Sequence, residues 1–116
     1  MNILVADDDE DIRELSVLIF GQRGWDVVTA TSGEEAAEAL ARTHFDVAVL
    51  DQNMPPGSGL EVAAQRREAG DPIPIVLWTG WGGLIDSAET ERLDVQVVNK
   101  AEVSRLPDVV AALVEG

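Results

Sequence analysis

The sequence predicts an α/β fold, a doubly wound parallel sheet of five strands with helices on both faces. Short apolar runs alternate five times with segments whose apolar residues have helical spacing, which is the pattern of repeated strand–helix units. Three of the apolar runs are nearly uninterrupted, as expected for strands covered on both faces. The chain has 116 residues, of which 46% are hydrophobic, so it fits one domain spanning residues 1–116.

The five strands are expected at residues 2–6, 26–30, 45–50, 74–78 and 95–98. The second and fifth contain Thr29 and Gln96, and such mixed strands suit the edges of a sheet, whereas the other three are almost wholly apolar. This distribution fits the flavodoxin-like strand order 2-1-3-4-5. In that order, ligands bind at the carboxyl ends of the strands, beside strands one and three.

A helix is expected after each strand. The first has apolar residues at helical spacing and is expected to close at Gly24. Ser32 and Ser58 are each followed three residues later by a glutamate, which is the spacing of a capping box, so they should open the second and third helices. The fourth helix, residues 84–92, is short and weakly amphipathic. The last helix can contain Pro107 only in its first turn.

The composition excludes several classes of protein. The 22 acidic residues outnumber the 8 lysines and arginines, for a net charge of −14, so nucleic acid and anionic membranes should repel the chain. No apolar run is long enough to cross a bilayer and the first residues lack the pattern of a secretion signal, so a cytoplasmic location is expected. The absence of cysteine removes disulfides and thiolate metal sites.

Acidic and polar side chains stand where the predicted strands end. Asp7 and Asp8 follow the first strand, Asp51 the third, Thr79 the fourth and Lys100 the fifth. Because strands one and three are neighbours in the predicted order, the three carboxylates should converge. Such a cluster is unfavourable unless some groups are protonated or a cation joins them. An all-oxygen set without His or Cys suits Mg²⁺.

The rest of the acidic run has a structural interpretation. Asp9 is placed to cap the first helix, and Glu10 and Asp11 would lie in its first turn, where the helix dipole favours anions. Taken alone, the whole run could be a solvated helix start; the polar residues at the other strand ends favour a site. The single histidine, His44, precedes the third strand and is expected at the surface of the opposite edge.

Four stretches give the chain a resemblance to a known family. They are ILVADDDE, VLDQNMPPGSGLEV, LWTG and VVNK, and they include the pattern of Asp51, Met54, Pro55 and Gly59. Together they resemble the receiver domains of two-component response regulators, and the resemblance covers the whole chain. Each stretch alone is weak support, whereas the combination is specific.

The resemblance implies a phosphorelay function. Asp51 would accept a phosphoryl group from the phosphohistidine of a sensor histidine kinase or a histidine phosphotransfer domain, and the domain would then switch conformation to signal. Such a domain is not an enzyme acting on other molecules, because it catalyses only its own phosphorylation and dephosphorylation. No direct contact with nucleic acid or membrane is implied, and a weak dimer is left open.

The resemblance also implies roles for single residues. The magnesium ligands would be Asp8 directly, Asp7 through water, the carboxylate of Asp51 and the backbone carbonyl of Asn53. The hydroxyl of Thr79 and the ammonium of Lys100 would hold the phosphoryl group after transfer.

Two positions depart from the family pattern. Val97 replaces the usual switch aromatic three residues before the lysine, and Ala101 replaces the usual proline after it. These departures put the aromatic switch and the usual dimer face in question, but not the acceptor site. In the glycine-rich stretch from Thr79 to Gly83, Trp81 could shield the acyl phosphate from water or pack against the sheet rim.

Three other functions are compared with the same residues. A phosphatase of the haloacid-dehalogenase type also uses an aspartyl nucleophile, but it needs a second Asp where this chain has Asn53. A flavin- or nucleotide-binding module would need a phosphate-binding loop after the first strand, where the acidic run would repel phosphate. A receiver-like interaction module that signals without phosphorylation is the main alternative, and Val97 in place of an aromatic supports it.

Overall fold

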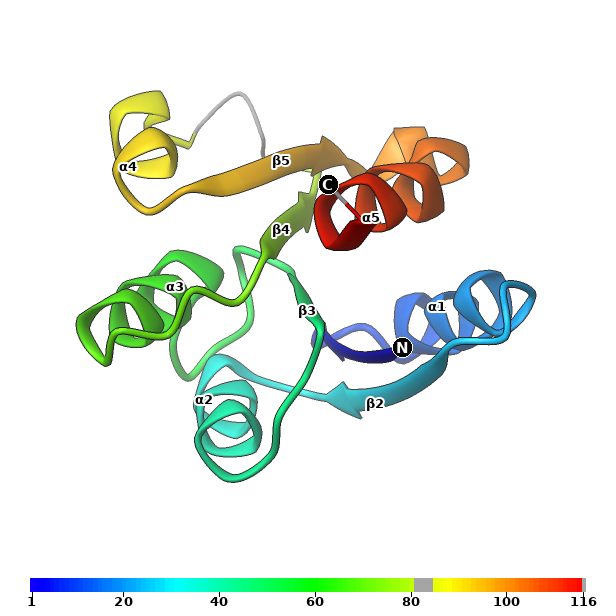
Figure 1. The fold of residues 1–116 in the computed structure, drawn as a ribbon, viewed down its shortest axis with the longest axis horizontal. Coiled ribbons are helices and arrows are strands. Elements are labelled where there is room, and N and C mark those ends of the chain that lie inside the picture. The colour runs from blue at the N-terminus through cyan, green and yellow to red at the C-terminus, as the bar shows by residue number, and fades with distance from the viewer. Residues whose placement is uncertain (81–84, 116) are drawn as a thin grey trace.

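The computed structural model describes residues 1–80 and 85–115, which form a parallel sheet flanked by helices (Figure 1). The strands are β1 (Asn2–Ala6), β2 (Asp26–Ala30), β3 (Val47–Leu50), β4 (Ile75–Thr79) and β5 (Val95–Asn99). They are all paired in parallel, in the order β2-β1-β3-β4-β5. The predicted fold class and strand order are therefore confirmed.

Strands β1 and β2 have the predicted bounds, and the others differ by one or two residues. Strand β3 begins at Val47, and the N–H of the preceding Asp46 donates to the carbonyl of Asn2. Strand β4 begins at Ile75, after Pro74, which has no N–H to give to a ladder. At their carboxyl ends, β4 and β5 each extend one residue beyond the prediction, to Thr79 and Asn99.

The helices are α1 (Glu10–Gly21), α2 (Gly33–Arg42), α3 (Gly59–Glu68), α4 (Ser87–Arg92) and α5 (Leu106–Glu115), with a 3₁₀ segment η2 (Lys100–Arg105) before the last. The predicted caps Asp9, Ser32 and Ser58 each accept a hydrogen bond from the first turn of their helix. Pro107 lies in the first turn of α5, as predicted.

Other details of the helices differ from the prediction. Helix α1 already ends at Gly21, and Gly24 adopts a positive φ of 75° in the turn beyond it. Leu84, the predicted start of the fourth helix, lies outside the described residues, and α4 itself starts at Ser87 with Asp86 as its cap. The segment η2 was not predicted from the sequence.

Two apolar layers hold the sheet between its helices. Because side chains alternate along a strand, Ile3 and Val5 face one layer while Leu4 faces the other. The first layer is completed by α1 and α5, through Phe20 and Val110 among others, and the second by α2 and α3. Figure 1 shows α1 and α5 on one side of the sheet and α2, α3 and α4 on the other.

Arg67, near the end of α3, joins two connections at the amino edge of the sheet. Its guanidinium donates to the carbonyl oxygens of Asp71 and Ile73 before β4, and to those of Leu93 and Asp94 before β5. Asp94 has a φ of +53°, a conformation uncommon for residues other than glycine. One side chain thus ties α3 to the end of α4.

None of the helices formed by the described residues combines the length and the apolar character needed to cross a bilayer. His44 is exposed and precedes β3, as predicted.

Candidate functional site

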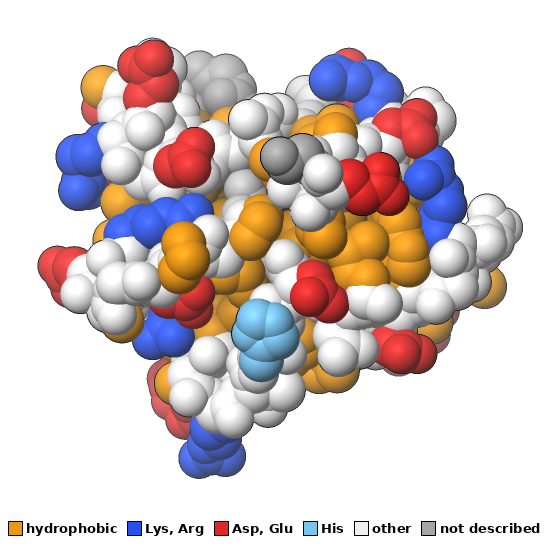
Figure 2. Space-filling view, in the orientation of Figure 1, with side chains coloured by type: hydrophobic (Ala, Val, Ile, Leu, Met, Phe, Trp, Pro, Cys, Tyr) orange, Lys and Arg blue, Asp and Glu red, His pale blue; other side chains and the backbone are white. Residues whose placement is uncertain are grey.

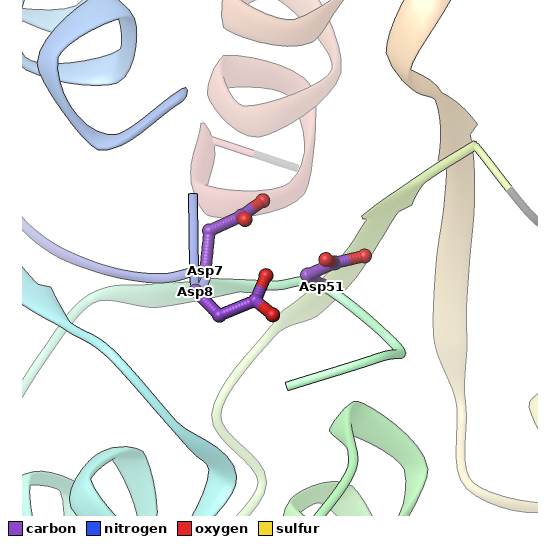
Figure 3. Close-up of side chains that lie close together, drawn as sticks. All are labelled: Asp7, Asp8 and Asp51. Carbon is purple, nitrogen blue, oxygen red and sulfur yellow. The ribbon is translucent and has the colours of Figure 1, made fainter. Parts of the chain in front are cut away.

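Three carboxylates gather at the carboxyl edge of the sheet (Figure 3). Asp7 and Asp8 follow β1, and Asp51 follows β3, whose last residue is paired with the last residue of β1. The N–H of Asp51 donates to the carbonyl of Ala6 at 2.9 Å, which fixes the two strand ends side by side. One oxygen from each carboxylate lies within 4.8 Å of the other two. The convergence predicted from the strand order is confirmed.

The three carboxylates differ in their access to water. Asp7 and Asp51 are buried, with 1% and 5% of their surface exposed, whereas Asp8 is exposed. The cluster therefore opens to solvent on the side of Asp8. A cation entering from solvent would meet Asp8 first and Asp51 deeper in the site.

Lys100 lies between the two buried carboxylates. As the first residue of η2, directly after β5, it places its Nζ 2.7 Å from Asp7 Oδ2 and 3.3 Å from Asp51 Oδ2. The contact with Asp7 is an ion pair, and the contact with Asp51 is both an ion pair and a hydrogen bond. One ammonium group thus contacts two buried carboxyl groups.

Burial raises the pKa of Asp7, and the negative charge of Asp51 adds to this effect. The ion pair with Lys100 and a hydrogen bond from the N–H of Asp9 act in the opposite direction without cancelling it. Burial lowers the pKa of Lys100, but the close contacts of its ammonium with the carboxylates of Asp7 and Asp51 and their electrostatic attraction outweigh burial and leave the pKa raised. The lysine is therefore charged at neutral pH.

The polar atoms of Asp7 are all engaged. Its Oδ1 accepts from the N–H of Asp9 at 2.9 Å, its Oδ2 pairs with Lys100, and its backbone carbonyl accepts from the guanidinium of Arg13 at 2.9 Å. Each buried carboxylate has one oxygen without a hydrogen-bond partner among the described residues: Asp7 Oδ2, which pairs with Lys100 through charge, and Asp51 Oδ1. A buried oxygen without a donor is unfavourable unless a cation or another group occupies that position.

These residues fit a hard divalent cation. The donor set is wholly carboxylate oxygen, which suits Mg²⁺, and two buried oxygens of the set, Asp7 Oδ2 and Asp51 Oδ1, have no hydrogen-bond partner among residues 1–80 and 85–115. Asn53, the other predicted ligand, lies in the loop after β3, where its backbone pairs with Ser58.

The remaining predicted residues have different places. Thr79 is the last residue of β4, is fully buried and is paired in register with Asn99. Val97 is 38% exposed on β5, so no large side chain fills the position of the usual aromatic. The N–H of Ala101 donates to the side chain of Asn99 at 2.8 Å, a bond that a proline could not form. Trp81 lies outside the described residues.

The sequence interpretation missed three residues that support the site. Arg13 holds the backbone of Asp7, and Gln52 accepts hydrogen bonds from the start of α3. Gly59 was noted only as part of a motif. A Cβ atom there would lie 2.6 Å from the carbonyl oxygen of Asp51, so the close approach of α3 requires glycine. For Gly59 the motif itself was the available signal, whereas Arg13 and Gln52 had none.

This chain belongs to the response regulator receiver domain family, whose model matches residues 3–106. The response regulator PilR of Pseudomonas aeruginosa is 36% identical over 81 residues, and the response regulator MprA of Mycobacterium leprae is 43% identical over 79 residues. These matches cover 70% and 68% of this chain. The matches span only 18% and 35% of the lengths of those two proteins.

Solved structures agree with this assignment. The response regulator TrrA of Thermotoga maritima, solved in complex with Mg²⁺ and BeF, has a TM-score of 0.87 at 33% identity, and the match covers 97% of both chains. A receiver domain from Francisella has a TM-score of 0.88 at 24% identity, covering 98% of this chain and 96% of that one, which supports the fold alone.

Proposed function

We propose that this receiver domain accepts a phosphoryl group on Asp51 from the phosphohistidine of a sensor histidine kinase or a histidine phosphotransfer domain. The observation that carries the proposal is the buried carboxylate of Asp51: its Oδ1 has no hydrogen-bond partner among the described residues, its Oδ2 lies 3.3 Å from the Lys100 ammonium, and it clusters with Asp7 and Asp8. The TrrA structure, which contains Mg²⁺ and BeF, supports the same chemistry in a related protein.

In the proposed reaction, an oxygen of Asp51 attacks phosphorus in line with the phosphorus–nitrogen bond of the donor. That bond breaks, its electron pair returns to the imidazole nitrogen, and an acyl phosphate forms on Asp51. A bound Mg²⁺ would neutralise charge on the transferring oxygens. Asp8 and Asp51 would hold it with the carbonyl of Asn53, and Asp7 would act through water because both of its oxygens are already engaged.

Lys100 and Thr79 are proposed to hold the product. The Lys100 ammonium already lies 3.3 Å from Asp51 Oδ2, so it can stabilise negative charge that develops there. Thr79 ends the neighbouring strand, and its hydroxyl is proposed to bond the phosphoryl group. These new contacts would bias the loops after β3 and β4 toward a second conformation, which is the signal.

We propose that residues 1–116 form one domain that catalyses only its own phosphorylation and dephosphorylation. Both apolar layers share one sheet, which supports a single folding unit. A cytoplasmic location and the absence of direct nucleic-acid or membrane contacts also belong to this proposal, in line with the net charge of −14.

A receiver-like interaction module that signals without phosphorylation is the second candidate. Two observations favour it: Val97 gives β5 no aromatic to move, and α4 contains no buried residue. Such a module would keep its fold and its partner whether or not Asp51 could be modified.

Phosphorylation by acetyl phosphate separates the two candidates. We expect mass spectrometry to find one added phosphoryl group on the parent protein with Mg²⁺, and none after chelation. Asp51→Asn should abolish the label completely, because it removes the nucleophile. The control Asp26→Asn changes an exposed acid at the other edge of the sheet and should label normally. An unlabelled parent, or labelled Asp51→Asn, would exclude the proposed acceptor.

A further inference from the structure

Gln52, the residue after Asp51, holds the start of α3 with two different oxygens. Its backbone carbonyl accepts from the N–H of Gly59 at 3.2 Å, and its side-chain Oε1 accepts from the N–H of Leu60 at 2.9 Å. These N–H groups are the first two of the helix and have no partner within it. Gln52 therefore bridges the acceptor strand and α3.

The contact at Gly59 makes this bridge rigid. A Cβ atom at that position would lie 2.6 Å from the carbonyl oxygen of Asp51 and 2.7 Å from Leu77 Cδ2, so the backbones of Asp51 and Gly59 are in direct contact. On the other side of the loop, Asn53 pairs with Ser58. Residues 51–53 are thus fixed against residues 58–60 along their whole length.

We infer that Gln52 is a positioning residue for the acceptor site, an inference that rests on the proposed function. Its side chain sets the direction of the backbone on both sides of itself, which carries the carboxylate of Asp51 and the carbonyl of Asn53. Both groups are proposed magnesium ligands, and their spacing must be held to a fraction of an ångström for tight binding. Residues that orient metal ligands typically change metal affinity by about 10–100-fold when they are removed.

The structural alternative is that Gln52 only caps α3. The same helix offers a matched comparison, because Ser58 Oγ accepts from the N–H of Glu61 at 3.2 Å. Ser58 caps the helix without being bonded through its side chain to residues 51–53. If capping were the whole role of Gln52, removing either side-chain acceptor should have the same effect on the site.

The test compares Gln52→Met, Ser58→Ala and Gln52→Glu in the intact chain. Calorimetry gives the affinity for Mg²⁺, and acetyl phosphate labelling gives the rate constant at saturating Mg²⁺. We expect Gln52→Met to weaken Mg²⁺ binding about 10-fold or more and to slow labelling at saturation. Ser58→Ala should stay within about twofold of the parent in both measurements. Gln52→Glu keeps an acceptor of the same length at the helix N-terminus, so it should retain the parent's labelling rate.

The outcomes separate this inference from the proposed function. If the parent is labelled and Gln52→Met matches Ser58→Ala, Gln52 is only a cap and the inference is wrong while the function stands. If Gln52→Glu is as slow as Gln52→Met, the hydrogen bond to Leu60 does not position the site. If the parent neither binds Mg²⁺ nor accepts phosphate, the proposed function fails and the inference fails with it.

Discussion

Lys100 faces two buried carboxylates and can neutralise only one of them. Burial is the main cause of the raised pKa of Asp7, and the charge of the neighbouring Asp51 adds to it, while the ion pair with Lys100 offsets only part of the shift. In the absence of a metal ion, the folded protein therefore carries an electrostatic strain that a divalent cation would relieve. The same groups that make the site reactive reduce the stability of the fold.

Replacing Asp7 with Asn should stabilise the protein at neutral pH. Because the pKa of Asp7 in the folded state is raised above 3.8, the fold favours the neutral carboxyl, and this contribution is lost as the pH rises through the raised pKa. Asn cannot ionise, so Asp7→Asn avoids the loss. Urea denaturation should give a larger free energy of unfolding for the variant at neutral pH, with the difference shrinking as the pH falls toward 3.8.

The matched control is Asp26→Asn, because Asp26 is exposed at the start of β2. It should change the free energy of unfolding by less than about 0.5 kcal/mol. A stability gain for Asp7→Asn that is the same at acid and neutral pH would contradict the electrostatic account.

Among the single residues of the site, the sequence predicted the acidic residues but not the residues that hold them in place. Asp7, Asp8, Asp51 and Lys100 could be found because each ends a strand of a recognisable pattern, and strand ends meet at one edge. Arg13 and Gln52 could not, because their contacts depend on rotamers and on the path of a loop. No periodicity in the sequence encodes either.

Helix α4 has little of its own to hold it. It has only six residues, none of them buried, so its place depends on Leu93 in the core and on the bonds from Arg67 to the carbonyls of Leu93 and Asp94. An isolated helix of this length is unstable in water. Arg67 is therefore the main polar anchor between α3 and this part of the chain.

Arg67→Met should destabilise the protein by about 3 kcal/mol, because hydrogen bonds from a charged group contribute about 1.5–3 kcal/mol and several are lost together. Urea denaturation measures the change. Hydrogen exchange should show that, relative to the parent protein, exchange accelerates more in α4 than in α2. Arg42→Met, at an exposed position, should change stability by less than about 0.5 kcal/mol. Equal losses for the two variants would show that Arg67 anchors nothing.

Sequence reasoning succeeded for elements with a local signal. The capping residues Asp9, Ser32 and Ser58 were predicted because a cap depends only on residues one turn away. It failed for η2 and for the start of α4, whose limits are set by contacts with distant segments. Asn99, for example, caps η2 by accepting a hydrogen bond from the N–H of Ala101, and no helical pattern in the sequence predicts this.

The charge of the whole molecule is a separate influence on stability. The net charge of −14 includes the site, but most acids lie elsewhere, and Figure 2 shows carboxylates spread over the visible face without a single dominant patch. Mutual repulsion of this kind weakens with ionic strength, since the Debye length falls from about 30 Å at about 0.01 M salt to about 8 Å at about 0.15 M.

Monovalent salt and Mg²⁺ should therefore stabilise the protein by different amounts. Salt should raise the free energy of unfolding by screening, and Mg²⁺ at the same ionic strength should add about 2.7 kcal/mol at a concentration about 100 times its dissociation constant. Thermal or urea denaturation in the two salts measures both contributions. Asp8→Asn should lose the magnesium increment and keep the salt increment; an undiminished magnesium increment would place the ion elsewhere.

The strand order was the most far-reaching prediction at this scale. It followed from the polar residues Thr29 and Gln96, which suit edge strands, and β2 and β5 do lie at the two edges. The family resemblance then covered the chain as a whole. The exposure of Val97 beside a six-residue α4 could not be foreseen, because it depends on how far a neighbouring helix reaches.

Lys100 is the only lysine in the chain, and its ammonium is held between two carboxylates. Reagents that acylate side-chain amines therefore have one target, and it is protonated and partly covered. A lysine-specific protease likewise has one peptide bond to cleave, between Lys100 and Ala101, directly beside the acidic cluster. The rate of cleavage at that single bond would therefore measure how often η2 separates from the carboxyl edge of the sheet.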